Sequence, residues 1–191
     1  MSHVYRALRV EEPFENQFER HLAELTTDDL PDHEVLVRVQ YSALNFKDAL
    51  AASGSKGVTR HYPHTPGIDA AGTVVESRHP DFRPGQAVLV TSYDLGMNTP
   101  GGFGQYVRVP AAWVVPLPTG LTTHDAMVLG TAGLTAALAR HQMEQMGQTP
   151  AAGPILVTGA TGGVGSLAVA LFARGGYEVV AATGKAKQHD Y

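Results

Sequence analysis

The chain has 191 residues, enough for one full domain and part of another, and 43% of them are apolar, as is usual for a globular protein. Its 14 basic and 18 acidic residues give a net charge of -4 without any basic block, so the composition does not favour nucleic-acid binding. The absence of cysteine excludes disulfides, thiolate nucleophiles and cysteine-bound metals, and it fits a cytosolic protein. We expect neither a signal peptide nor a membrane span, because the first residues lack a signal core and no apolar run reaches membrane length.

Before Leu121 the sequence predicts short strands separated by turns. The clearest strand covers residues 34–41, where three valines alternate with other residues at the spacing of a half-buried strand. A short helix is expected over 43–51, and loops over 53–66 and 96–104. Many short strands at this spacing predict a compact β-barrel. The remaining expected strands are 4–10, 18–25, 67–77, 86–91, 106–109 and 113–116.

Beyond Leu121 the pattern becomes helical. Thr122 or Thr123 is a suitable N-cap, and Asp125 follows in the first turn, where a carboxylate favours the helix dipole. Glycines interrupt the helix at 130–133, and it resumes over 134–146. We therefore expect one domain over 1–125 and a second over 126–191.

The second domain contains a glycine-rich turn between a strand and a helix. An aliphatic run at 155–157 leads into small residues, and an alanine-rich apolar segment follows at 167–173. The turn fits G-x-G-x-x-G, with Ala160 in the first glycine place, then Gly162 and Gly165. In such a turn the second glycine allows close approach of a pyrophosphate, the third allows helix–strand packing, and the helix N-terminus faces the phosphates. The placement predicts a dinucleotide site; the alternative is a plain glycine-rich turn.

The next expected strand, 177–182, tests which dinucleotide would bind. NAD sites place an acidic residue roughly 20 residues past the glycines, where it binds the ribose hydroxyls. Here Thr183, Gly184 and Lys185 occupy that place. A hydroxyl and an ammonium are suited to a 2′-phosphate, so the sequence favours NADP over NAD. The alternative is that Lys185 is an ordinary solvated lysine.

Several stretches together resemble the medium-chain dehydrogenases/reductases, and in particular the zinc-free quinone oxidoreductase-like group with its NADPH-dependent acryloyl-CoA reductase branch. The resemblance implies an α/β protein with a β-barrel: a GroES-like catalytic domain followed by the start of a doubly wound Rossmann domain. The family extends further, so we expect the 191 residues to be incomplete, inactive alone, and homodimeric at the family's full length. The stretches are Tyr41–Asp48, Pro63–Gly72, Gly101–Tyr106, Gly130–Ala136 and the glycine turn.

The resemblance also bears on the chemistry. Zinc-dependent members carry metal ligands where this chain has Asn45 and Ile68, so no metal is expected, because a catalytic zinc needs three protein ligands. Without that Lewis acid, the implied reaction is hydride transfer from NADPH to the β-carbon of an α,β-unsaturated acyl thioester such as acryloyl-CoA. The alternatives are an NADPH-dependent quinone or enone reductase, and a non-catalytic fragment.

The resemblance assigns roles to individual residues. Asn45 would face the reacting bond, or it is a structural amide at the helix start; Tyr41 would contact the cofactor, or it fills the core. Lys47 would offer charge to the substrate, or it pairs with Asp48. Thr131 would touch nicotinamide or phosphate. The pyrophosphate would be lined by Thr161, Gly162, Gly163 and Val164, the 2′-phosphate by Thr183, Gly184 and Lys185, and candidates for binding CoA phosphates are Lys47, Lys56 and Arg60.

Overall fold

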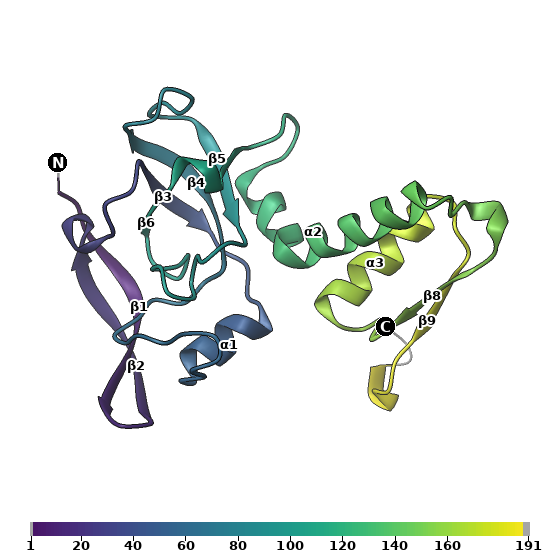
Figure 1. Ribbon diagram of the computed structural model, residues 1–191, viewed down its shortest axis with the longest axis horizontal. Helices are drawn as coiled ribbons and strands as arrows, with labels where there is room; N and C mark the ends of the chain where they lie inside the picture. The colour runs from purple at the N-terminus through teal and green to yellow at the C-terminus, as the bar shows by residue number, and fades with distance from the viewer. Residues whose placement is uncertain (1, 189–191) are drawn as a thin grey trace. The chain divides into compact units, whose positions relative to one another are not determined.

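A computed structural model describes residues 2–188 (Figure 1). The chain divides into two compact units, one ending at Gly130 and the other beginning at Thr131. The sequence predicts a boundary at 125/126, within the helix that links these units.

The first unit contains all of the strands expected before Leu121. An antiparallel sheet with the order β6-β3-β4-β5-β7 is formed by β3 (Val35–Tyr41), β4 (Asp69–Ser77), β5 (Ala87–Thr91), β6 (Tyr106–Val109) and β7 (Val114–Pro116). The strands β1 (Val4–Phe14) and β2 (Gln17–Thr26) form a separate antiparallel hairpin. Short 3₁₀ turns lie at Thr27–Asp29 and Ala111–Trp113.

Both faces of β3 are covered, which explains its apolar composition. Val35 and Val37 pack into the main valine-rich core of the sheet. Leu36 points to the other face, where it is fully buried with Tyr5 and Ala7 of the hairpin. Burying a side chain of this kind stabilises the fold by about 1.5–3 kcal/mol. The alternation predicted from the sequence therefore serves two cores.

The hairpin is joined to the rest of the unit by backbone hydrogen bonds from β1. Val10 exchanges bonds with His64, each 2.8 Å long, and Leu8 N donates to Phe103 O over 2.9 Å. The predicted strands are thus present, but they form an open five-stranded sheet and a hairpin connected by isolated bridges, without a continuous closed ladder.

The helix α1 spans Phe46–Ala52 and begins later than the expected 43–51. Asn45 is its N-cap, with extended φ and ψ of -117° and 158°, so the preceding residues are excluded from the helix. The helix places Asn45 and Asp48 at its first turn.

The helix α2 covers Thr123–Gln145, and its capping follows the prediction. Thr122 Oγ1 accepts a hydrogen bond from Asp125 N over 3.1 Å, and Asp125 Oδ2 accepts from Thr122 N over 3.2 Å. Gly130 breaks the helix with φ 50° and ψ -156°, a backbone region open essentially to glycine alone. The expected interruption is therefore present at its first residue.

The second unit is built around a parallel pair of strands. β8 (Ile155–Thr158) pairs with β9 (Val179–Ala182), and α3 (Gly163–Arg174) connects them. Ile155 and Val157 are buried with Phe172 of α3, whereas the intervening Leu156 is 63% exposed. One face of the strand pair is thus covered and the other is open. Short 3₁₀ turns lie at Pro150–Ala152 and Ala186–Gln188.

Candidate active site

Asn45 lies between two buried carboxylates of the first unit. Its backbone N–H donates to Asp48 Oδ2 over 2.7 Å, and its side-chain Nδ2 donates to Asp69 Oδ2 over 2.8 Å. Asp48 and Asp69 are both essentially inaccessible to solvent, whereas Asn45 is partly exposed. The Asn45 side chain is therefore anchored by Asp69 and remains partly exposed to solvent.

The contact with Asp69 fixes which way the Asn45 amide points. A carboxylate accepts hydrogen bonds, so the group facing Asp69 must be the NH₂ and the carbonyl oxygen must point elsewhere. Asp69 is itself anchored through its backbone, since Ser42 Oγ donates to Asp69 O over 2.6 Å. Gly130 also approaches closely: a Cβ there would lie 2.8 Å from Asp69 Oδ2. The sequence alone gives no sign of this contact, because Asn45 and Asp69 are 24 residues apart.

Asp48 joins α1 to the start of β4. Its Oδ1 accepts from the buried N–H of Ile68 over 2.8 Å, in addition to the bond from Asn45. Burial raises the pKa of Asp48, and the backbone hydrogen bonds from Asn45 and Ile68 act in the opposite direction. Both acceptor oxygens face the backbone, so this carboxylate has a structural task.

Lys47 is not paired with Asp48 within the described residues, although the sequence favoured that pairing. Its Nζ lies 3.7 Å from Met97 Sδ, and residues 2–188 contain no carboxylate within ion-pair distance of it. Lys56, by contrast, pairs with Glu12 and lies over the rings of Phe18 and Tyr62. Of the candidate cations for CoA phosphates, Lys56 is thus already neutralised.

Ile68 stands where zinc-dependent members of the family are expected to carry a metal ligand, and here it is a buried core residue. Among residues 2–188, no three His, Cys, Asp or Glu side chains are arranged to hold a metal ion. Independence of zinc stays a prediction, based on the side chains present at positions 45 and 68.

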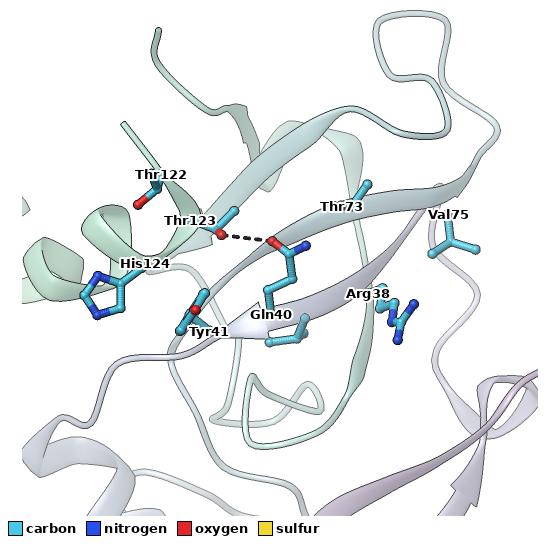
Figure 2. Close-up of a pocket in the computed structure, with 9 residues that line it drawn as sticks. Arg38, Gln40, Tyr41, Thr73, Val75, Thr122, Thr123 and His124 are labelled. Atoms are coloured by element: carbon cyan, nitrogen blue, oxygen red, sulfur yellow. Dashed lines mark hydrogen bonds between the residues drawn. The ribbon is translucent and has the colours of Figure 1, made fainter. Parts of the chain in front are cut away.

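Tyr41 is 47% exposed and therefore does not fill the core. It lines a pocket of about 1050 Å³ within the first unit, together with residues of β3, β4 and the start of α2 (Figure 2). Its ring meets that of His124 edge-on at 5.2 Å, and nearby Thr123 Oγ1 donates to Gln40 Oε1 over 2.9 Å. Asn45 does not line this pocket, so the pocket and the Asn45 network are separate features of the unit. Cofactor contact by Tyr41 stays a prediction.

In the second unit, the glycine turn has the close packing that its sequence predicts. A Cβ at Gly165 would lie 2.2 Å from Gly159 O, so only glycine lets α3 approach the end of β8 this closely. Gly159 has φ 62°, and Ala160 N donates to Ala182 O over 3.1 Å, which ties the turn to β9. The turn is therefore fixed by backbone contacts on both sides.

The N-terminus of α3 begins at the place expected for a pyrophosphate. Gly162 is the N-cap, and the intrahelical ladder begins with Ser166 N donating to Gly162 O over 2.8 Å. The N–H groups of Gly163, Val164 and Gly165 precede that bond and lie at the positive end of the helix dipole. Gly163 and Val164 are exposed. The residues present thus fit a dinucleotide phosphate.

The residues expected at the 2′-phosphate lie beside this turn. Thr161 Oγ1 and Thr183 Oγ1 are 3.0 Å apart, and Lys185 N donates to Thr183 Oγ1 over 3.2 Å. Thr161, Ser166 and Thr183 line one pocket of about 630 Å³. Lys185 is exposed, and so is Lys187 two residues later, a second cation that was not predicted from the sequence.

Thr131, a further expected cofactor contact, lies on α2, where its carbonyl accepts a hydrogen bond from Thr135 Oγ1 over 2.7 Å.

The fold is a GroES-like domain followed by the start of a Rossmann domain, which is the arrangement of the medium-chain dehydrogenases/reductases. Residues 31–119 match the alcohol dehydrogenase GroES-like domain. No helix among residues 2–188 is long and apolar enough to cross a membrane.

Three relatives resemble the chain over most of its length. The chain is 50% identical over 168 residues to the acrylyl-CoA reductase AcuI of Ruegeria pomeroyi, covering 88% of this chain and 51% of AcuI. The yhdH oxidoreductase of Salmonella enterica, solved in complex with NADP, is 44% identical with a TM-score of 0.94, covering 97% of this chain and 57% of that one. Bacillus subtilis yhfP, solved with NAD bound, is 47% identical with a TM-score of 0.95, covering 99% of this chain and 57% of that one.

YhfP of Bacillus subtilis is named as a quinone oxidoreductase. The chain therefore carries an alcohol dehydrogenase GroES-like domain and is similar to both acrylyl-CoA reductases and quinone oxidoreductases. It spans 51% and 58% of the length of AcuI and YhfP, respectively.

Proposed function

We propose that the protein is a zinc-independent oxidoreductase that uses NADPH to reduce the activated double bond of an α,β-unsaturated acyl thioester such as acryloyl-CoA. The observation that carries the proposal is the glycine turn at the start of α3, where Gly165 packs against Gly159 and leaves free N–H groups at the helix N-terminus. Identity of 50% to an acrylyl-CoA reductase supports the substrate class.

The bound cofactor would supply a hydride, and this chain would bind and orient it. Gly163 and Val164 offer backbone N–H groups to the pyrophosphate, while Thr161 and Gly162 shape the turn. Thr183, Gly184 and Lys185 would recognise the adenosine ribose, and none of the three is acidic and able to repel a 2′-phosphate. Thr131 and Tyr41 remain proposed cofactor contacts. Because Bacillus subtilis yhfP was solved with NAD bound, the preference for NADPH over NADH needs its own test.

Asn45 would act on the substrate. Reduction of the double bond places negative charge on the thioester oxygen, and an N–H donor aimed at that oxygen lowers the barrier. One N–H of the Asn45 amide is already bonded to Asp69, so the second N–H would have to serve the substrate. Neither Asp48 nor Asp69 is suited to meet that negative charge.

The test of the proposal is NADPH oxidation by the complete gene product with acryloyl-CoA or with 1,4-benzoquinone. We expect turnover of acryloyl-CoA with a higher kcat/KM, unchanged by exhaustive chelation. Turnover of the quinone alone would support the second candidate, a quinone reductase, which the 48% identity to YhfP favours. Loss of activity together with stoichiometric zinc would contradict the metal-free assignment.

The cofactor preference is tested at Lys185. Lys185→Glu should weaken NADPH binding roughly tenfold to a hundredfold, as expected for loss of a charge-assisted hydrogen bond, and leave NADH binding little changed. Arg174→Glu, at the opposite end of α3, is the matched control. Equal weakening for both cofactors would mean that Lys185 does not recognise the 2′-phosphate.

A further inference from the structure

Two basic residues, Lys47 and Arg60, contact the same loop. The loop Asp94–Thr99 contacts Lys47 through Met97, whose Sδ lies 3.7 Å from Lys47 Nζ. The next residue, Asn98, accepts a hydrogen bond from Arg60 N through its Oδ1 over 3.1 Å. Lys47 and Arg60 are both exposed, and neither forms an ion pair within residues 2–188.

The Asp94–Thr99 loop is fixed by contacts with the buried part of the first unit. Leu95 is fully buried, and His64 Nε2 lies 2.9 Å from Gly96 O. A Cβ at Gly96 would lie 2.4 Å from the carbonyl carbon of Gly67, so the loop is seated directly on the backbone before β4. Positions beside a fixed loop are preorganised for binding, which lowers the entropic cost of holding a ligand.

The Asp94 carboxylate forms its hydrogen bonds within the loop. Asp94 accepts hydrogen bonds from Asn98 Nδ2 over 3.2 Å and from Thr99 Oγ1 over 3.4 Å. A thioether is a weak acceptor, so Met97 leaves most of the hydrogen-bonding capacity of the Lys47 ammonium unused. The two cations are therefore available to an anion from outside.

We propose that Lys47 and Arg60, which both contact the Asp94–Thr99 loop, bind the phosphates of a coenzyme A thioester. The inference rests on the proposed function and adds that the enzyme recognises the carrier as well as the acyl group. Asn45, two residues before Lys47, holds the reacting end, and the long flexible pantetheine arm connects the two. A quinone has no group for these cations.

The experiment compares acryloyl-CoA with S-acryloyl-N-acetylcysteamine, which has the same thioester and no phosphate. In the complete gene product, Lys47→Gln and Arg60→Gln should each raise KM for acryloyl-CoA roughly tenfold or more, with kcat little changed, as for loss of charge-assisted hydrogen bonds. KM for the cysteamine thioester should stay constant. Lys56→Gln and Arg78→Gln are the controls, because these cations are already paired with Glu12 and Asp32.

A binding measurement keeps the inference testable without turnover. Calorimetric titration of CoA into the complete gene product saturated with NADP⁺ should give a Kd that weakens in both variants and with added salt. Equal effects of Lys47→Gln on both thioesters would place Lys47 at the reacting group and overturn the proposal, as would CoA binding that neither variant alters. Absence of turnover with either thioester, with CoA binding still dependent on Lys47 and Arg60, would instead contradict the proposed reaction alone.

Discussion

Removal of the Asp48 carboxylate should destabilise the first unit substantially. In Asp48→Ala, the buried N–H of Ile68 loses its acceptor at 2.8 Å, and Asn45 N loses a bond of 2.7 Å at the start of α1. An orphaned buried donor costs about 1–3 kcal/mol, and a lost helix cap about 1 kcal/mol. Relief of the burial that raises the pKa of Asp48 offsets part of this loss. We therefore expect a loss of about 2–3 kcal/mol.

The assay is urea unfolding followed by the fluorescence of Trp113. It is the single tryptophan of the chain and packs against the main core of the first unit, so its signal reports that unit. With a slope of about 2 kcal/mol per M, the midpoint should fall by roughly 1–1.5 M urea. Asp48→Asn should lose less, because its carbonyl oxygen retains one of the two bonds.

Asp32→Ala is the control for charge removal, since Asp32 forms an exposed ion pair with Arg78 and such pairs contribute little. An Asp48→Ala midpoint equal to that of Asp32→Ala would refute the view that Asp48 holds α1 against β4.

Three further predictions follow from single contacts. Burial lowers the pKa of His64, so the unfolded chain takes up the proton at a higher pH than the folded chain; the free energy of unfolding should therefore fall as pH drops below about 6.5, by up to ~1.4 kcal/mol per pH unit. In His64→Gln, urea unfolding at pH 5.5 and 7 should lack this pH dependence. The same pH dependence in the variant and the parent protein would contradict the prediction. Gly165→Ala should abolish NADPH binding and lower the melting temperature, whereas Gly163→Ala, whose Cβ would meet its nearest atom at 3.6 Å, should keep the melting temperature; equal melting of both would disprove the packing argument. Finally, the 191-residue polypeptide should associate in ultracentrifugation and not oxidise NADPH, because Leu156 and Val180 are 63% and 48% exposed on the strand pair; a monomer that turns over would contradict this.

The strands could be predicted because their signal is local. Alternation at 34–41 and the aliphatic run at 155–157 both correspond to strands, β3 and β8. Boundaries of helices were less accurate, since they depend on single backbone conformations. α1 starts at Phe46 because Asn45 is extended, and α3 starts at Gly163 inside the glycine run.

The arrangement of strands could not be predicted, because closure depends on pairings distant in sequence. The bridge of Val10 to His64 joins residues with no mutual sequence signal. The same limitation hid Asp69 as the partner of Asn45 and left the pairing of Lys47 with Asp48 as the favoured interpretation. By contrast, the spacing of Thr161 and Thr183 could be anticipated, because a strand–turn–helix unit brings the carboxyl ends of its parallel strands together.

The Asn45 network stabilises two buried carboxylates with an uncharged side chain. Asp48 and Asp69 are buried on either side of Asn45, and a carboxylate removed from water requires compensation. Hydrogen bonds from Asn45 N and Nδ2 provide part of this compensation through a neutral group. Asn45→Ala should therefore lower both activity and stability, because the same amide that would face the substrate also satisfies Asp69. An Asn45→Ala variant with unchanged stability would show that Asp69 finds compensation elsewhere, and the change in kcat would then report the substrate contact alone.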